Sequence, residues 1–133
     1  MKALIPKIIG AGLNTLAHIA PTKTAHMGFE LFLRPIRVPI KEKQKAFFNT
    51  AEQETFYHKG IKIQTYRWGN GEKKILLLHG WQSHTYRWKL YIEELSKNYT
   101  VYSIDAPGHG LSGGNQLSVP LYSEVIEAQM KRI

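Results

Sequence analysis

The residues of this sequence that could do chemistry gather in two short loops. One of them contains Gly110-Leu111-Ser112-Gly113-Gly114, which matches the G-x-S-x-G motif that surrounds the nucleophilic serine of many hydrolases. His109 stands beside this motif and is a candidate general base. The other loop, His79-Gly80-Trp81, follows an apolar run. A serine and a histidine in this arrangement would indicate nucleophilic attack on an acyl group.

Ser112, however, does not stand where a nucleophile must stand. The motif works when a strand runs directly into the serine and a helix follows at once, because the sharp turn between them holds the hydroxyl group in one geometry. Here the preceding apolar run ends at Ile104, and Pro107 and two glycines separate it from the serine. No apolar helix begins until about Pro120. We therefore interpret Ser112 as a structural residue of a turn.

The elements that position both loops follow from the hydrophobic pattern. Strands are predicted at 55–58, 61–68, 75–78 and 100–104, and helices at about 85–97 and from Pro120 onward. The run 75–78 is apolar without alternation, which is typical of a strand buried on both faces of a parallel sheet. Strand, helix and strand in this order predict a parallel βαβ unit. Ligands of such sheets bind beyond the carboxyl ends of the strands, and both loops start there.

In these contexts the two loops resemble the α/β-hydrolase superfamily. The resemblance is carried by Leu77-Leu78-His79-Gly80-Trp81 after one strand and by Asp105-x-Pro107-Gly108-His109-Gly110-x-Ser112 after the next. It covers roughly residues 55–133 and implies the front half of an α/β-hydrolase sheet, a β-hairpin followed by β-α-β-α. It also implies a serine hydrolase of the esterase or lipase type that uses no cofactor and no metal. Its substrate would be a small-molecule or lipid-like ester, thioester or amide.

The resemblance assigns roles to the loop residues. The backbone N–H of Trp81 would be one donor of the oxyanion hole, which stabilises the negative charge of an acyl-transfer transition state. Gly80 would let the backbone turn tightly, and His79 would anchor the loop from a buried position. The second loop would buttress the first through residues expected to be structural: Asp105, Pro107, Gly108, His109, Gly110 and Ser112. Asp105 is expected to accept N–H bonds across its turn.

The catalytic triad of this family follows in the order serine, acid, histidine. The final predicted helix uses the residues after Ser112, so no strand for a nucleophile fits before Ile133. We therefore expect the triad downstream of Ile133 and expect the chain, as a truncated piece, to be inactive by itself. Two alternatives stay open: a haloalkane or epoxide hydrolase with an aspartate nucleophile, and a non-catalytic module that docks on a partner or a membrane.

Residues 1–54 lie outside the match to 55–133 and are predicted to form an amphipathic helical extension, similar to N-terminal extensions of some bacterial members. Apolar residues form one stripe of a helix within 1–20: Ile5, Ile8, Ile9, Leu13, Leu16 and Ile19. We expect this stripe to pack on protein, with peripheral membrane contact through 1–20 as the alternative. Polar residues interrupt the apolar core that a signal peptide needs, which favours a cytoplasmic location.

The composition excludes several other classes of protein. The chain has 133 residues, of which 43% are hydrophobic, and this is typical of a small globular protein. No apolar run approaches the ~20 residues of a membrane-spanning helix. The absence of cysteine excludes disulfides, cysteine-bound zinc and a cysteine nucleophile. The net charge of +8 is spread along the chain without a basic arm, so we expect no nucleic-acid partner.

Overall fold

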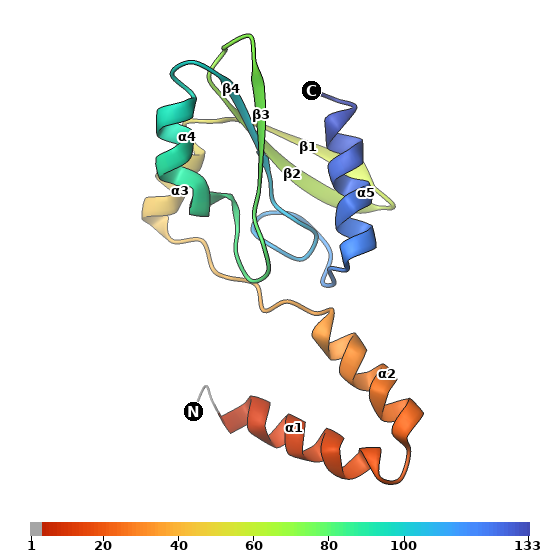
Figure 1. Ribbon diagram of the computed structural model, residues 1–133. Helices are drawn as coiled ribbons and strands as arrows, with labels where there is room; N and C mark the ends of the chain where they lie inside the picture. The colour runs from red at the N-terminus through yellow and green to blue at the C-terminus, as the bar shows by residue number, and fades with distance from the viewer. Residues whose placement is uncertain (1–3) are drawn as a thin grey trace. The chain divides into compact units, whose positions relative to one another are not determined.

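The computed structural model describes residues 4–133 and divides the chain into two compact units, Met1–Arg34 and Pro35–Ile133. The first unit consists of two helices, α1 (Leu4–Ala17) and α2 (Pro21–Phe32), which pack on each other (Figure 1). Proline favours the first turn of a helix, where its missing N–H is not needed, and Pro21 begins α2 in this way. Residues 1–3 of the predicted segments 1–20 and 1–54 lie outside the described residues.

The apolar stripe of α1 is only partly covered within this unit. Leu13 and Leu16 are half-buried, whereas Ile5 and Ile9 are exposed. The expectation that the whole stripe packs on protein therefore stays a prediction. Within residues 4–133, none of the helices combines the length and the apolar character that crossing a bilayer would need.

The second unit is built on one mixed sheet. Its elements are α3 (Glu42–Phe48), β1 (Glu52–His58), β2 (Ile61–Trp68), β3 (Lys74–Leu78), the 3₁₀ helix η1 (Thr85–Trp88), α4 (Lys89–Leu95), β4 (Thr100–Ile104) and α5 (Val119–Met130). The strand order is β1-β2-β4-β3. β1 and β2 form the predicted hairpin, and its turn is made by two left-handed residues, Lys59 and Gly60. β4 is antiparallel to β2 and parallel to β3.

Two apolar clusters cover the two faces of the sheet. One cluster joins α3 and α4 to the sheet and contains Phe47, Phe48, Tyr66, Trp68, Ile92 and Val101. The other places Val125 of α5 against residues of the strands: Phe56, Ile63 and Ile104. Successive side chains of a strand point to opposite faces, so β2 and β4 each contribute to both clusters. The unit therefore has helices on both faces of its sheet, as the predicted α/β class requires (Figure 1).

The division between the units differs from the boundary suggested after residue 54. Its physical reason is the burial of α3 in the second unit, where Phe47 stacks on Trp68 at 5.2 Å between ring centroids and Phe48 stacks on Tyr66 at 4.8 Å. Such aromatic pairs bury large apolar areas and add about 0.5–1.5 kcal/mol beyond that burial. Residues 35–54 accordingly belong to the same compact unit as the sheet.

Candidate functional site

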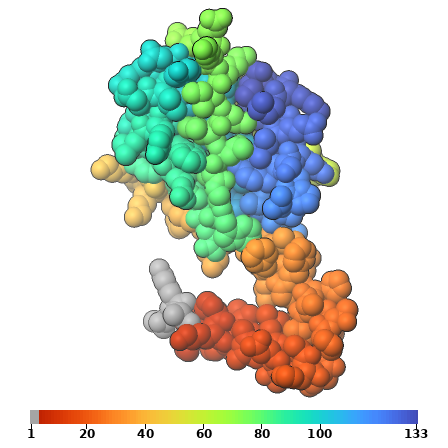
Figure 2. All heavy atoms as spheres, viewed as in Figure 1, coloured from red at the N-terminus to blue at the C-terminus, as the bar shows by residue number. Residues whose placement is uncertain are grey.

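The candidate site lies where β3 and β4 end. Leu78 pairs with Ile104 in the parallel register, so the loops 79–84 and 105–114 leave the sheet side by side. α5 reaches the same region, because the Tyr122 hydroxyl donates to the carbonyl oxygen of His79 at 3.1 Å. Green atoms of the β3 region and blue atoms of α5 adjoin in the space-filling view (Figure 2).

His79 joins the first loop to the second. Its ring is fully buried, and its Nε2 accepts the backbone N–H of Ala106 at 3.0 Å. Because Nε2 accepts, the proton of the neutral ring is on Nδ1, and it is donated to the carbonyl oxygen of Gly80 at 2.8 Å. His79 thus occupies the buried, backbone-bonded position that the resemblance implied.

His109 makes the reciprocal connection. Its Nε2 accepts the backbone N–H of Gln82 at 3.0 Å, and its Nδ1 donates to the carbonyl oxygen of Pro107 at 2.9 Å. Burial lowers the pKa of His79 and of His109, which keeps both rings neutral. Both nitrogens of each ring are engaged with backbone groups. A ring held in this way has no free nitrogen for moving a substrate proton.

Asp105 ties three elements together from a fully buried position. Its carboxylate accepts the N–H of Thr85 at 2.9 Å, the N–H of Leu111 at 2.9 Å and the hydroxyl of Tyr66 at 2.9 Å. These donors compensate for the loss of water around the charge. Burial and the neighbouring carboxylate together raise the pKa of Tyr66 far above its usual range, so this hydroxyl stays a donor.

Ser112 uses its hydroxyl group for the backbone. Its Oγ donates to the carbonyl oxygen of Asp105 at 2.5 Å and accepts the N–H of Gln64 at 2.8 Å. Only 3% of the residue is exposed. A hydroxyl held between two backbone groups, with no histidine among its partners, has the geometry of a structural residue and not of an activated nucleophile.

The first loop turns at a residue that the sequence did not indicate. Gln82 has a φ of 48°, in the left-handed region that favours glycine. Gly80 has no left-handed φ, and a Cβ built on it would meet no atom within 4 Å. The tight turn expected at Gly80 is therefore made at Gln82, whose N–H is bonded to His109. Gly80 instead leaves open space beside the backbone of the loop.

Trp81 lies between these two residues and is 41% exposed. Its ring meets the His109 ring edge-on, with 5.7 Å between centroids. The side chain is thus partly accessible to solvent. The role of its N–H as an oxyanion donor stays a prediction.

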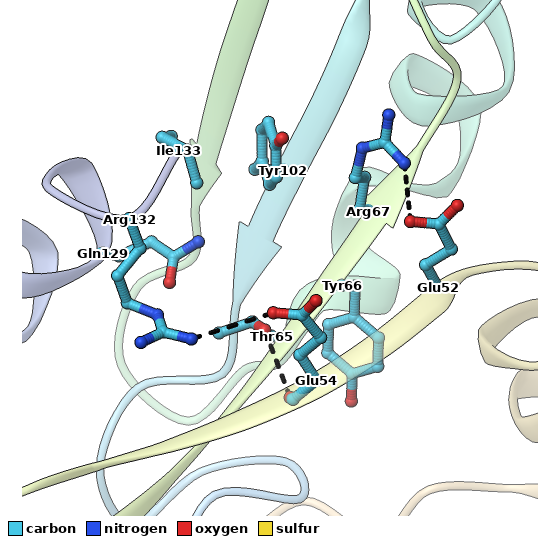
Figure 3. A pocket seen from close by; sticks show the side chains of 9 residues that line it. All are labelled: Glu52, Glu54, Thr65, Tyr66, Arg67, Tyr102, Gln129, Arg132 and Ile133. Carbon is cyan, nitrogen blue, oxygen red and sulfur yellow. Dashed lines mark hydrogen bonds and ion pairs between the residues drawn. The ribbon is translucent and has the colours of Figure 1, made fainter.

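A separate polar pocket of about 100 Å³ contains none of the residues of the two loops (Figure 3). It is lined by Glu52, Glu54, Thr65, Tyr66, Arg67, Tyr102, Gln129, Arg132 and Ile133. Its charged side chains pair with one another, since Arg67 contacts Glu52 at 2.6 Å and Arg132 contacts Glu54 at 3.8 Å. Within residues 4–133, no three His, Asp or Glu side chains gather so that they could hold a metal ion.

Comparison with known proteins agrees with this fold. Residues 69–128 match the family model described as serine aminopeptidase, S33. Over 47 residues the chain is 36% identical to the pimeloyl-[acyl-carrier protein] methyl ester esterase of Edwardsiella ictaluri, a match that covers 35% of this chain and 18% of the relative. Over 53 residues it is 36% identical to the dihydrolipoyllysine-residue acetyltransferase component of the acetoin cleaving system of Cupriavidus necator, covering 40% and 14%.

Solved structures show the same arrangement. A thioesterase domain from the curacin biosynthetic pathway is similar with a TM-score of 0.58 at 22% identity, over 62% of this chain and 33% of that one. The epoxide hydrolase VrEH1 of Vigna radiata is similar with a TM-score of 0.57 at 25% identity, over 63% and 29%. The chain thus spans about a third of these structures and less than a fifth of the curated relatives.

The resemblance to the α/β-hydrolase superfamily is therefore confirmed. The second unit has a mixed sheet with a parallel β3–β4 pair and the fold of these neighbours, and it covers only part of their chains.

Proposed function

We propose that the protein acts as a serine hydrolase on an ester, thioester or amide of a small or lipid-like molecule, and that this chain supplies the oxyanion side of the site. The observation that carries the proposal is the fixed backbone of the first loop. The His79 ring donates to the carbonyl oxygen of Gly80, and the Gln82 N–H donates to the His109 ring, so the loop is held on both sides of Trp81. A backbone donor that is already in place stabilises an oxyanion without reorganisation, at roughly 3–4 kcal/mol per donor.

The open space at Gly80 supports the same proposal. A Cβ built on Gly80 meets no atom within 4 Å, so the space beside this residue is open to a substrate. The exposed ring of Trp81 would contact the acyl group. In this mechanism the histidines of the two loops hold the backbone and transfer no proton.

The attacking group has to come from outside these residues. Ser112, His79 and His109 are committed to backbone groups, so they are not the nucleophile and the base of the proposed reaction. We propose that the serine, the acid and the catalytic histidine are supplied by sequence that follows Ile133. The proposal needs no metal, no cofactor and no nucleic acid.

The similarity to VrEH1 favours one alternative, an epoxide hydrolase with an aspartate nucleophile. Opening an epoxide places charge on the leaving oxygen, not on a carbonyl, so the two reactions differ in what the loop must stabilise. Substrates therefore distinguish them more directly than the shared fold does.

The test compares residues 1–133 with the whole reading frame that contains them, on a p-nitrophenyl ester and on an aromatic epoxide. We expect ester turnover by the longer protein and none by residues 1–133. Trp81→Ala keeps the N–H and should raise KM more than it lowers kcat. Turnover of the epoxide alone would establish the alternative, and turnover by residues 1–133 that is lost in Ser112→Ala would overturn the structural interpretation of this serine.

A further inference from the structure

Arg37 makes an unusual set of contacts with the second loop. It lies in the extended segment between Pro35 and α3, outside the residues that match the family model. Its Nη1 donates to the carbonyl oxygens of His109 at 3.0 Å, Gly110 at 2.5 Å and Ser112 at 2.8 Å, and its Nη2 donates to that of Gly114 at 3.1 Å. One side chain thus binds four carbonyl groups of one loop.

The shape of the loop explains why a guanidinium group fits it. Gly108, Gly110 and Gly114 have φ values of 74°, 45° and 78°, so the backbone curls and its carbonyl groups converge. Converging carbonyl dipoles repel one another unless a cation lies among them. Arginine presents five N–H donors in a planar fork, whereas lysine presents a compact point charge. The loop therefore offers a site that suits arginine better than lysine.

The contacts of Arg37 with the second loop are connected to the candidate site through His109. Arg37 holds the carbonyl group of His109, and the ring of the same histidine accepts the N–H of Gln82. Gln82 is the left-handed residue of the first loop and follows Trp81. Two contacts thus connect the guanidinium group with the backbone next to the proposed oxyanion donor.

We propose that Arg37 is a positioning residue, which orients the backbone at Trp81 and Gln82 by holding His109. The effect of Arg37 on catalysis rests on the proposed function, whereas its effect on the backbone at Gln82 does not. A merely structural role predicts something else: Arg37 would attach its own segment to the second loop, and its loss would leave Gln82 unchanged.

The test measures hydrogen exchange of single backbone amides by NMR in the folded full chain, without substrate. Arg37→Met should speed the exchange of the Gln82 amide about tenfold, because a charge-assisted contact two steps away is lost. The amide of Val101 in the centre of the sheet reports global opening and should change much less. Arg87→Met, at an exposed arginine of η1, is the matched control and should leave both amides unchanged.

If Arg37→Met does not fold, the same exchange measurement is made on Arg37→Lys. It should also speed the exchange at Gln82, since a compact ammonium group with three donors cannot reproduce the contacts of the guanidinium group with four carbonyl oxygens. Unchanged Gln82 exchange in either folded variant overturns the proposal, as does a Gln82 change that only equals the change at Val101. If a longer protein turns over the ester as proposed, Arg37→Lys should lower its kcat at nearly constant KM. Faster Gln82 exchange in a protein without ester turnover would leave the positioning intact and refute the proposed function.

Discussion

His79 and His109 exchange hydrogen bonds between two loops, each ring accepting a backbone N–H that belongs to the other histidine's loop. The ring centroids are 5.3 Å apart. The acceptor nitrogen is Nε2 in both cases, so both rings are neutral and carry the proton on Nδ1. The two loops are consequently held in one relative position, on which the geometry of the site depends.

This arrangement predicts that acid destabilises the fold. Burial lowers the pKa of His79, His84 and His109, so the unfolded chain takes up protons at a pH where the folded chain does not. The free energy of unfolding should be fully retained above the ordinary histidine pKa of about 6.5 and fall as the pH drops below it. Urea unfolding at pH 7.5 and at pH 5.5 measures the difference. Equal stability at both values would contradict neutral, buried rings.

A substitution identifies the ring that contributes to this pH dependence. In His109→Gln one of the buried rings is removed, and the loss of stability between the two pH values should become smaller than in the original chain. His26→Gln changes an exposed histidine of α2 and serves as the control for the loss of a histidine. The same dependence in both variants would show that His109 does not take part.

Gly110→Ala should destabilise the protein by about 2–4 kcal/mol, beyond what a left-handed φ alone costs. The residue has a φ of 45°, and a Cβ there would overlap the carboxylate of Asp105. Gly60→Ala separates the two effects, because Gly60 has a φ of 77° with nothing within 4 Å of its Cβ, and it should lose only about 1 kcal/mol. Urea midpoints measure both. Equal losses would mean that Asp105 can move away.

The turn at Gln82 predicts an opposite pair of effects in the first loop. Gly80→Ala should change stability by less than about 0.5 kcal/mol, since its Cβ enters open space. Gln82→Val should cost about 1–2 kcal/mol, because a β-branched residue tolerates a φ of 48° poorly. Thermal unfolding followed by circular dichroism compares the two variants. A larger loss of stability in Gly80→Ala than in Gln82→Val would show that the tight turn depends on Gly80.

Loss of the Asp105 carboxylate should lower the free energy of unfolding more than loss of any one of its hydrogen-bond donors. Tyr66→Phe removes the hydroxyl donor and should cost about 1–3 kcal/mol. Asp105→Asn places an N–H₂ group against donors that need an acceptor and should cost about 3–5 kcal/mol. If the double variant costs no more than Asp105→Asn alone, the hydroxyl acts only through this carboxylate. Additive losses in that cycle would show that Tyr66 stabilises the core independently.

The position of the two loops beside each other, at the carboxyl ends of β3 and β4, could be predicted from local sequence patterns. The apolar run 75–78 and the helical spacing after it predicted the parallel pair of β3 and β4, and this pairing is present. The burial of that run on both faces is not, because β3 lies at the edge of the sheet and its residues 75–78 are only half-buried. Adjacent parallel strands then require their following loops to be neighbours. Phe47 and Phe48 lie within the segment 1–54 that was predicted to be helical. Their stacking on β2 could not be predicted, since aromatic contacts between distant segments leave no local period.

By itself the sequence determined the class of the fold, the order of the strands and helices after residue 50, and the positions of the two loops; the helix expected at 85–97 is a 3₁₀ helix followed by a shorter α-helix. These depend on hydrophobic period, turn residues and motif spacing, all of which are local properties of the chain. The tertiary structure alone decided which ring accepts which N–H, that the turn lies at Gln82 and not at Gly80, and that Arg37 binds carbonyl groups more than 70 positions away. Hydrogen bonds between remote backbone groups depend on where the folded chain places them, and no spacing along the chain encodes that placement.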